Sequence, residues 1–330
     1  MARIFSGIKP TADIPHLGNY IGALRNWASL QGQHETIYCV VDLHSLTVPW
    51  EPKELGRRTR AAAASLIASG IDPLTSTLFV QSDVREHSEL AWTLTCLARM
   101  GELGRMTQYK DKARNQEQSS VGAGLFNYPV LMAADILAHK ADLVPIGDDQ
   151  VQHLELARDL ADRFNRLLGE TFPLPQPFVS EQGSRVMSLD DPLKKMDKSA
   201  ERPHSVIWMN DSPDAVRSKI SRAVTDSGRD IVYGPDKPAI SNLLDMFCLL
   251  SDRKVTDIED EFQGKGYADF KSALTEVVIA FLQPFQQRFD ALMADEKGLE
   301  KVLVEGAEKA RAVAAETLSE VRKKVGLWAP

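Results

Sequence analysis

Three lysines stand close together in the segment DPLKKMDKSA at residues 191–200: Lys194, Lys195 and Lys198. Ammonium groups on a loop can close over a triphosphate and neutralise the charge that develops on a leaving pyrophosphate. A solvated surface loop would explain the same residues. Because the chain carries a formal charge of −7, this basic patch is local, and a protein that coats nucleic acid non-specifically is excluded.

A second candidate for phosphate chemistry is GIKPTADIPHLGNYIGAL at residues 7–24. We expect a strand to end at Ile8 and a helix to begin near Gly18. Gly18 lets a ring or phosphate approach the backbone, and a helix start offers N–H groups and a positive dipole end. His16 would point into the same crevice and donate to phosphate oxygens. An ordinary strand-to-helix turn with a partly exposed histidine is the alternative.

A carboxylate lies on an otherwise apolar helix face in YPVLMAADI. Tyr128, Met132, Asp135 and Ile136 fall on one face at helical spacing. An unpaired buried charge is costly, so Asp135 needs a partner. Either an arginine or the backbone supplies it inside the fold, or Asp135 accepts a hydrogen bond from a donor-only ligand group, such as an indole N–H.

Two further segments carry polar groups that suit a nucleotide. VPIGDDQVQH ends a strand and starts a helix, and Asp149 is its expected N-cap beside the exposed backbone of Gly147. RMTQYKDKAR holds a basic cluster for which a solvated helix face is the alternative: Arg105, Lys110, Lys112 and Arg114.

The first 170 residues alternate short apolar runs with helical patterns, which predicts an α/β fold: a Rossmann-like, doubly wound parallel sheet. The ligand crevice of such a sheet lies beyond the carboxyl ends of its strands. After Pro203 the patterns are helical, so we predict a second, all-helical domain. The expected parts are a Rossmann-like domain at 1–190, a lysine-rich mobile loop at 191–203, a helical domain at 204–290 and a C-terminal helix at 291–330 that packs back on the body.

Composition excludes several other classes of protein. Cys39, Cys96 and Cys248 are far apart, which fits neither a disulfide framework nor a zinc site, and we expect buried, reduced thiols. The N-terminus has no secretory signal pattern and no run of residues reaches the length of a membrane span. We therefore expect a cytoplasmic protein with no membrane partner.

PHLGN and KMDKS resemble the two signature motifs of class I aminoacyl-tRNA synthetases, HIGH and KMSKS, in the same order and at a similar separation. The resemblance extends to the bacterial tryptophanyl branch of that family and covers most of residues 5–245. It is carried by these segments: FSGIKPT, GNYIGALRNW, GELGRMTQYKDK, YPVLMAADIL, DLVPIGDDQVQHLELARDLADRFN, RVMSLDDP, RAVTDS and ISNLLD.

This resemblance implies a role for each matching residue. Asp135 would read the indole N–H, and Tyr128 and Gln150 would hold the amino group of tryptophan. The remaining tryptophan-site positions are Phe5, His44, Met132, Val144 and Ile146. The ATP-binding positions are Lys9, Pro10, Thr11, Gly18, Asn19, Gly147, Asp148, Asp149, Val186, Lys195, Met196, Asp197, Lys198 and Ser199. The implied catalytic residues are His16, Lys112, Lys195 and Lys198.

The implied activity is that of a tryptophan–tRNA ligase. Tryptophan and ATP give tryptophanyl-adenylate and pyrophosphate, and the tryptophanyl group then passes to the 3′ end of tRNA(Trp). Mg²⁺ would arrive with the ATP, without a dedicated protein metal site. The implied assembly is a homodimer. The domain at 1–190 would be catalytic and the helical domain at 204–290 would recognise the anticodon. The tRNA would meet the helical domain, where Arg217, Lys219 and Arg222 offer phosphate contacts.

Three positions depart from the general motifs. Asn19 replaces the final histidine of HIGH, as is normal for tryptophanyl enzymes. Asp197 replaces the central serine of KMSKS, and its charge should weaken ATP binding. Lys9 stands where related bacterial sequences carry glutamine. A tyrosyl-tRNA synthetase and a non-catalytic tryptophan sensor or RNA-binding regulator are the alternatives, and only Asp197 favours the regulator.

Overall fold

The computed structural model describes residues 1–10, 14–107, 109–110, 121–147, 150–178, 186–197 and 202–328. Its sheet has five strands in the order β3-β2-β1-β4-β5, and all neighbouring strands are parallel. The predicted parallel α/β sheet is therefore confirmed. The strands are β1 (Arg3–Ile8), β2 (Glu35–Val40), β3 (Thr77–Val80), β4 (Leu143–Pro145) and β5 (Gln176–Phe178).

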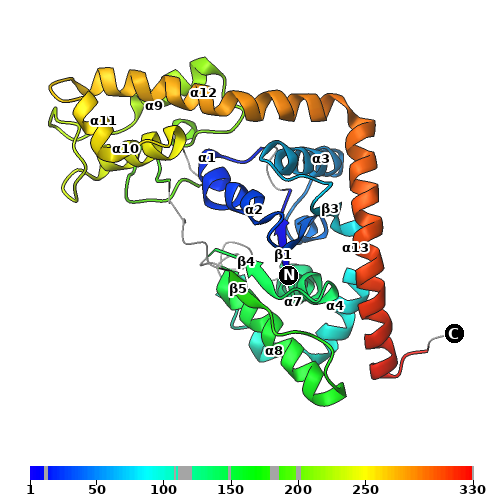
Figure 1. Ribbon diagram of the computed structural model, residues 1–330. Helices are drawn as coiled ribbons and strands as arrows, with labels where there is room; N and C mark the ends of the chain where they lie inside the picture. Colours follow the sequence, from blue (N-terminus) through cyan, green and yellow to red (C-terminus); the bar gives the residue numbers. More distant parts are fainter. Residues whose placement is uncertain are drawn as a thin grey trace.

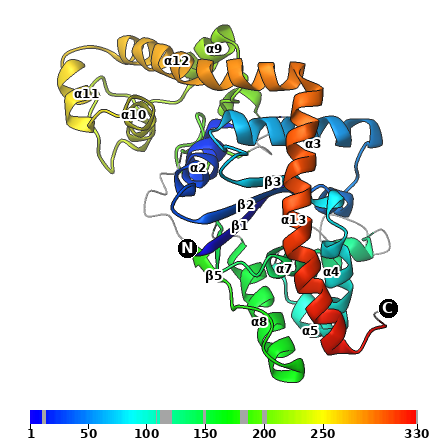
Figure 2. The same ribbon diagram turned by 45° about the vertical axis from the view of Figure 1, so that its right-hand side comes forward.

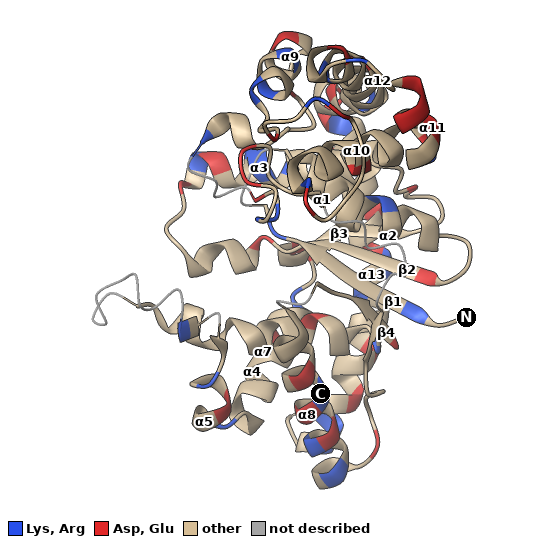
Figure 3. Cartoon of the chain, turned by 90° about the vertical axis from the view of Figure 1, so that its left-hand side faces the viewer, with Lys and Arg blue, Asp and Glu red and all other residues tan. Residues whose placement is uncertain are grey.

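Helices cover both faces of this sheet (Figure 2). Side chains alternate along β2, so that Tyr38 and Val40 enter one apolar cluster while Ile37 and Cys39 enter the other. Burial on both faces explains why the strands read as nearly continuous apolar runs. The charged residues of β1 and β2 are Arg3 and Glu35 at their amino ends (Figure 3), which pair at 3.0 Å.

The helices of the sheet region divide between the two faces. On one side lie the segments that follow β1 and β2: α1 (Leu17–Asn19), the π-helix η1 (Tyr20–Leu24), α2 (Arg25–Leu30) and α3 (Pro52–Ala68). On the other lie α4 (Glu86–Leu97), α5 (Met100–Leu103), α7 (Ala123–Ala138) and α8 (Val151–Leu168). Short 3₁₀ turns follow strands β2 and β3, namely η2 (Leu43–Thr47) and η3 (Gln81–Asp83), and another, η6 (Pro203–Ser205), precedes the helical part of the chain.

The remainder of the chain is helical, as predicted. Three shorter helices pack beside one long helix, and the last helix turns back along the sheet region (Figure 1). They are α9 (Pro213–Arg222), α10 (Pro238–Ser251), α11 (Val255–Glu261), α12 (Tyr267–Ala294) and α13 (Glu296–Val325). Among the described helices, none is both long enough and apolar enough to span a bilayer.

Helix α13 covers the outer edge of β3, and Gly306 makes this contact close. A Cβ at Gly306 would overlap the carbonyl oxygen of Leu78 and lie 2.7 Å from its carbonyl carbon. A helix laid on the edge strand protects it from pairing with other chains. Only glycine permits backbone contact at this distance.

Gly306→Ala is therefore expected to lower the free energy of unfolding by at least about 2 kcal/mol, because the obstructing atoms are backbone and cannot rotate away. Chemical denaturation followed by circular dichroism measures this change. Gly56→Ala in α3 is the matched control, since nothing lies within 4 Å of its added Cβ. It should be neutral or stabilise the protein by about 0.5–1 kcal/mol. Equal effects of the two substitutions would contradict the close-contact argument.

Two sequence expectations fail in detail. β5 was not predicted, because its three residues, QPF, have no apolar run and become a strand only by pairing with β4. Cys39 is buried as expected, whereas Cys96 is exposed on α4 and Cys248 is half-buried. An apolar run therefore predicted burial correctly in strand β2 but wrongly on the surface helix α4.

Candidate functional site

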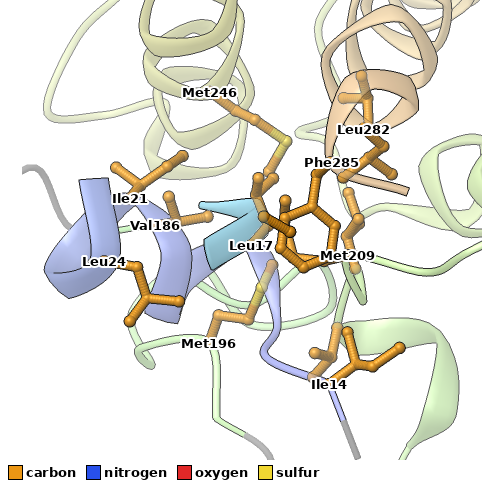
Figure 4. Close-up of a cluster of buried hydrophobic side chains, with 14 of the residues drawn as sticks. Ile14, Leu17, Ile21, Leu24, Val186, Met196, Met209, Met246, Leu282 and Phe285 are labelled. Carbon is orange, nitrogen blue, oxygen red and sulfur yellow. The ribbon is translucent and has the colours of Figure 1, made fainter. Parts of the chain in front are cut away.

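The histidine–glycine segment and the lysine segment, almost 180 residues apart, lie against one another. A Cβ at Gly18 would stand 3.4 Å from the Cβ of Met196 and 3.1 Å from Nδ1 of His16. Leu17, Met196 and Val186 share one apolar cluster with residues of the long helix α12 (Figure 4). Burial of Met196 thus anchors the lysine segment beyond the carboxyl end of β1.

Backbone pairing gives the lysine segment a defined shape up to residue 197. The amide of Met196 donates to the carbonyl of Val186 at 3.1 Å, and that of Ser188 donates to Lys194 at 2.8 Å. Lys195 forms an antiparallel bridge with Met187. Met196 is buried while Lys195 and Asp197 on either side of it are exposed, so the ladder presents these charged side chains to solvent.

His16 begins the helix, but its environment differs from the expected one. It is 3% exposed, and its ring packs edge-on against Trp208 with centroids 5.9 Å apart. Its Nδ1 accepts a hydrogen bond from the amide of Asn19 at 3.2 Å. A neutral His16 therefore carries its proton on Nε2, the tautomer that can donate to a phosphate oxygen.

The start of this helix offers fewer free amides than the sequence indicated. The amide of Leu17 donates to the carbonyl of Ile207 at 2.8 Å, and that of Asn19 is capped by His16. The bond of Leu17 ties the start of the helix to the segment between η6 and α9. A side chain at Gly18 would press on His16 and Met196.

The other nucleotide-site candidates are placed as follows. Lys9 follows β1 and donates to the hydroxyl of Thr47 at 3.4 Å, Pro10 and Val186 are buried, and Gly147 and Asn19 are exposed. The N-cap of α8 is Gln150, not Asp149 as predicted. Six candidates lie outside the described residues: Thr11, Lys112, Asp148, Asp149, Lys198 and Ser199.

Asp135 is buried at 1% exposure and is held by three donors from separate elements. The Oδ2 atom bonds Nε2 of His44 at 2.8 Å. The Oδ1 atom accepts from Nε2 of Gln81 at 2.7 Å and bonds Nδ1 of His87 at 2.7 Å. The internal partners of the carboxylate are thus two histidines and an amide rather than an arginine.

These bonds determine the charge of Asp135. Burial alone would raise its pKa, but the hydrogen bonds from His44 and His87 outweigh burial and hold the pKa below its usual range. A carboxylate oxygen can accept two hydrogen bonds. Within the described part of the chain, Oδ1 accepts two and Oδ2 only one. One acceptor position on Oδ2 therefore remains for a donor.

The expected ring-pocket residues belong to the apolar cluster that also holds the chain neighbours of Asp135, Ala134 and Ile136. Phe5 and Val144 are buried in the cluster against which Met132 and Ile146 pack. Tyr128 lies edge-on to His44 with ring centroids 6.2 Å apart, and its hydroxyl bonds Nε2 of His153 at 2.7 Å. Aromatic and aliphatic walls around one carboxylate suit a flat apolar ring with a single N–H.

A third buried histidine lies next to this network. His139, at the C-cap of α7, is fully buried and its Nε2 lies 2.9 Å from Nε2 of His87. Burial lowers the pKa of His139 well below its usual value. At mildly acidic pH the imidazole of His139 therefore binds a proton in the unfolded chain but not in the folded chain.

The stability of the protein should consequently fall as pH drops through the unfolded histidine value near 6.5, while it is independent of His139 above that value. Between pH 7 and pH 5 the unaltered protein should lose up to about 2 kcal/mol more unfolding free energy than His139→Gln, which cannot titrate. Asp135, whose pKa is lowered, affects stability only near and below pH 4. Urea denaturation of both proteins at several pH values measures the difference, and parallel pH curves would contradict it.

The sequence did not single out several of these residues. Gln81, His87, His139 and His153 have no motif of their own, and only the fold brings them to Asp135 and Tyr128. The basic segment of α9 is also less available than predicted. Lys219 is paired with Asp211, with both side chains nearly buried, and Arg217 pairs with Asp214 and Glu276. Arg222 is exposed.

Comparison with known proteins agrees with this geometry. The profile of a family described as tRNA synthetases class I (W and Y) matches residues 1–283. A tryptophan–tRNA ligase of Clostridium perfringens is 50% identical over 324 residues, covering 98% of this chain and 97% of the relative. One of Streptomyces avermitilis, designated tryptophan–tRNA ligase 2, is 49% identical over 98% of this chain and 96% of the relative.

Solved structures extend the likeness to three dimensions. Tryptophanyl-tRNA synthetase of Mycoplasma pneumoniae superposes with a TM-score of 0.88 at 35% identity, covering 99% and 98% of the two chains. That of Campylobacter jejuni, complexed with ADP and tryptophan, gives a TM-score of 0.88 at 34% identity over 98% and 100%. The chain therefore belongs to the class I aminoacyl-tRNA synthetases for tryptophan and tyrosine, and within them to the bacterial tryptophanyl branch.

Proposed function

We propose that the chain is a tryptophan–tRNA ligase. It activates L-tryptophan with ATP to tryptophanyl-adenylate and pyrophosphate, and transfers the tryptophanyl group to the 3′ end of tRNA(Trp). The observation that carries the proposal is the buried, ionised Asp135, which keeps one acceptor position among apolar walls. A polar group that would be left unpaired by a ring without N–H discriminates strongly against such rings.

ATP–pyrophosphate exchange tests the first step of this reaction. The unaltered protein should catalyse ATP–pyrophosphate exchange in the presence of tryptophan but not of tyrosine. It should also charge tRNA(Trp). Exchange that depends on tyrosine would favour the tyrosyl member of the same family. Binding of tryptophan without any charging of tRNA would instead favour a regulator.

At the nucleotide end, this chain contributes positioning and charge rather than a covalent nucleophile. His16 donates from Nε2 to a phosphate oxygen, and Lys195 with Lys198 and Lys112 neutralise the departing pyrophosphate. Gly18 and Met196 keep the histidine–glycine segment and the lysine segment in close contact. Mg²⁺ would arrive with the ATP substrate and would supply further positive charge to its phosphates.

At the amino-acid end, each group recognises one part of tryptophan. Asp135 accepts the indole N–H, while Tyr128 and Gln150 hold the amino group. The carboxylate of tryptophan is then free to attack the α-phosphorus of ATP. Gln150 suits this role because it is the N-cap of α8, the helix that follows β4 along the chain.

Asp197→Ser is expected to lower KM for ATP by about threefold to tenfold. The substitution removes the repulsion between this carboxylate and the phosphates, which is worth about 1 kcal/mol. KM for tryptophan should not change. Steady-state exchange at varied ATP measures the effect. An unchanged or higher KM for ATP in this variant would remove the idea that Asp197 weakens nucleotide binding.

The enzyme's macromolecular partners are tRNA(Trp), which meets the helical part of the chain, and a second copy of the chain. Trp92 on α4 is 70% exposed and lines an open apolar cavity of about 300 Å³ between η2, α4 and α7. A face of this kind supports a self-complementary dimer contact. Sedimentation should give a dimer for the unaltered protein and a monomer for Trp92→Arg.

A further inference from the structure

A chain of two histidines stands behind Asp135, on the side away from His44. His87 bonds Oδ1 of Asp135 through Nδ1 at 2.7 Å, and its Nε2 faces Nε2 of His139 at 2.9 Å. Both rings are fully buried. His139 stacks on Phe5 at 5.5 Å between centroids and meets Phe79 edge-on at 5.6 Å. The ring of His139 is therefore held between aromatic neighbours from β1 and β3, and His87 contacts the β3 residue, Phe79.

The facing Nε2 atoms of His87 and His139 need one proton between them to form a hydrogen bond. If His139 holds that proton on Nε2 and donates it, His87 accepts on Nε2, keeps its own proton on Nδ1 and donates that proton to Asp135. If His87 held both protons, His139 would carry its proton on Nδ1, for which the described residues offer no acceptor. A buried N–H without an acceptor is costly and rare, so the first arrangement is favoured.

The neighbours of His139 favour the same neutral ring. The guanidinium of Arg3 donates to the backbone carbonyl of His139 at 2.8 Å, and its charge opposes a second proton on the imidazole. The ring thus acts as a fixed N–H donor toward His87. His139 reaches Asp135 only through His87, because it makes no hydrogen bond to the carboxylate itself among those of the described residues.

We propose that His139 is a positioning residue for amino-acid recognition, acting by fixing the tautomer of His87. With His87 donating, Oδ1 of Asp135 is saturated by His87 and Gln81, and the remaining acceptor position lies on Oδ2. This inference rests on the proposed function, in which Asp135 receives the indole N–H. His139 affects that contact indirectly, through His87. It was not among the predicted tryptophan-site residues.

The test compares two replacements of His139 in tryptophan-dependent ATP–pyrophosphate exchange. His139→Phe keeps a ring and removes the donor, whereas His139→Gln keeps a side-chain N–H that can reach His87. Two substrates are used: L-tryptophan, and the analogue 3-benzothienyl-L-alanine, in which sulfur replaces the indole N–H. KM for ATP and thermal unfolding of each variant report whether the fold is intact.

His139→Phe should raise KM for tryptophan by about 10-fold to 100-fold, the usual effect of losing one hydrogen bond in a charged network. Its preference for tryptophan over the benzothienyl analogue should fall by a similar factor, and its KM for ATP should change less than about twofold. His139→Gln should restore both quantities to within about threefold of the unaltered protein.

Two results would overturn the inference. One is a loss of activity in His139→Phe with unchanged preference between the two substrates, which indicates packing alone. The other is a failure of His139→Gln to restore tryptophan KM while it folds normally. Failure of the proposed function is recognised separately, because the unaltered protein would then show no exchange with tryptophan in the same assay.

Discussion

Asp135→Asn is expected to lower kcat/KM for tryptophan by about 10³-fold or more, the largest effect of any single change considered. The carboxylate accepts from His44, Gln81 and His87 at 2.7–2.8 Å. An asparagine amide turns its NH₂ toward one side of this network, whichever way it rotates. One donor then faces another donor, and the remaining acceptor position for an indole N–H is lost or displaced.

The effect should be specific to the amino acid. KM for ATP should stay within about threefold in Asp135→Asn, because the nucleotide segments near His16 and Met196 belong to another part of the site. Asp83→Asn is the matched control, since Asp83 ends η3, the turn that follows β3, and burial with the nearby charge of Asp42 raises its pKa. The Asp83→Asn substitution should leave KM for tryptophan unchanged. An equal rise of both KM values in Asp135→Asn would point to general disruption instead of lost recognition.

The sequence predicted the architecture well because its strongest signals are local. Buried parallel strands give apolar runs, and the amphipathic spacing of Leu90 and Leu94 gives α4. β5 escaped prediction because three residues, one of them Pro177, become a strand only through pairing with β4. The N-cap of α8 was misplaced by one residue, from Asp149 to Gln150, because helix ends carry little periodic information.

The site was predictable only where one element carries the signal. Asp135 stood out because a charge on an apolar helix face is unusual. Its partners come from η2, η3 and α4, and only the parallel sheet order brings these elements to one end of α7. The same reasoning explains Lys219, whose ion pair with Asp211 joins α9 to the preceding loop and removes a charge that the sequence alone left available for RNA.

The second large effect is expected for Lys195→Ala, which should lower kcat of the exchange reaction by about 10²-fold to 10³-fold. The side chain of Lys195 is exposed, while the backbone around it is fixed by the bridge to Met187 and by burial of Met196. Removal of the ammonium group should therefore leave the fold and tryptophan KM unchanged. It takes away a charge that matters mainly when pyrophosphate departs.

The neighbouring lysine provides the matched control for this prediction. Lys194 precedes Lys195 in the same segment, is itself exposed, and forms an ion pair with Asp191 at 3.0 Å. Adjacent residues of an extended ladder point to opposite sides, so Lys194→Ala should change kcat by less than about threefold. Pre-steady-state measurement of adenylate formation separates chemistry from product release. Equal effects of the two substitutions would mean that the segment contributes only diffuse positive charge, whereas a loss confined to Lys195→Ala places one ammonium group at the reacting phosphates.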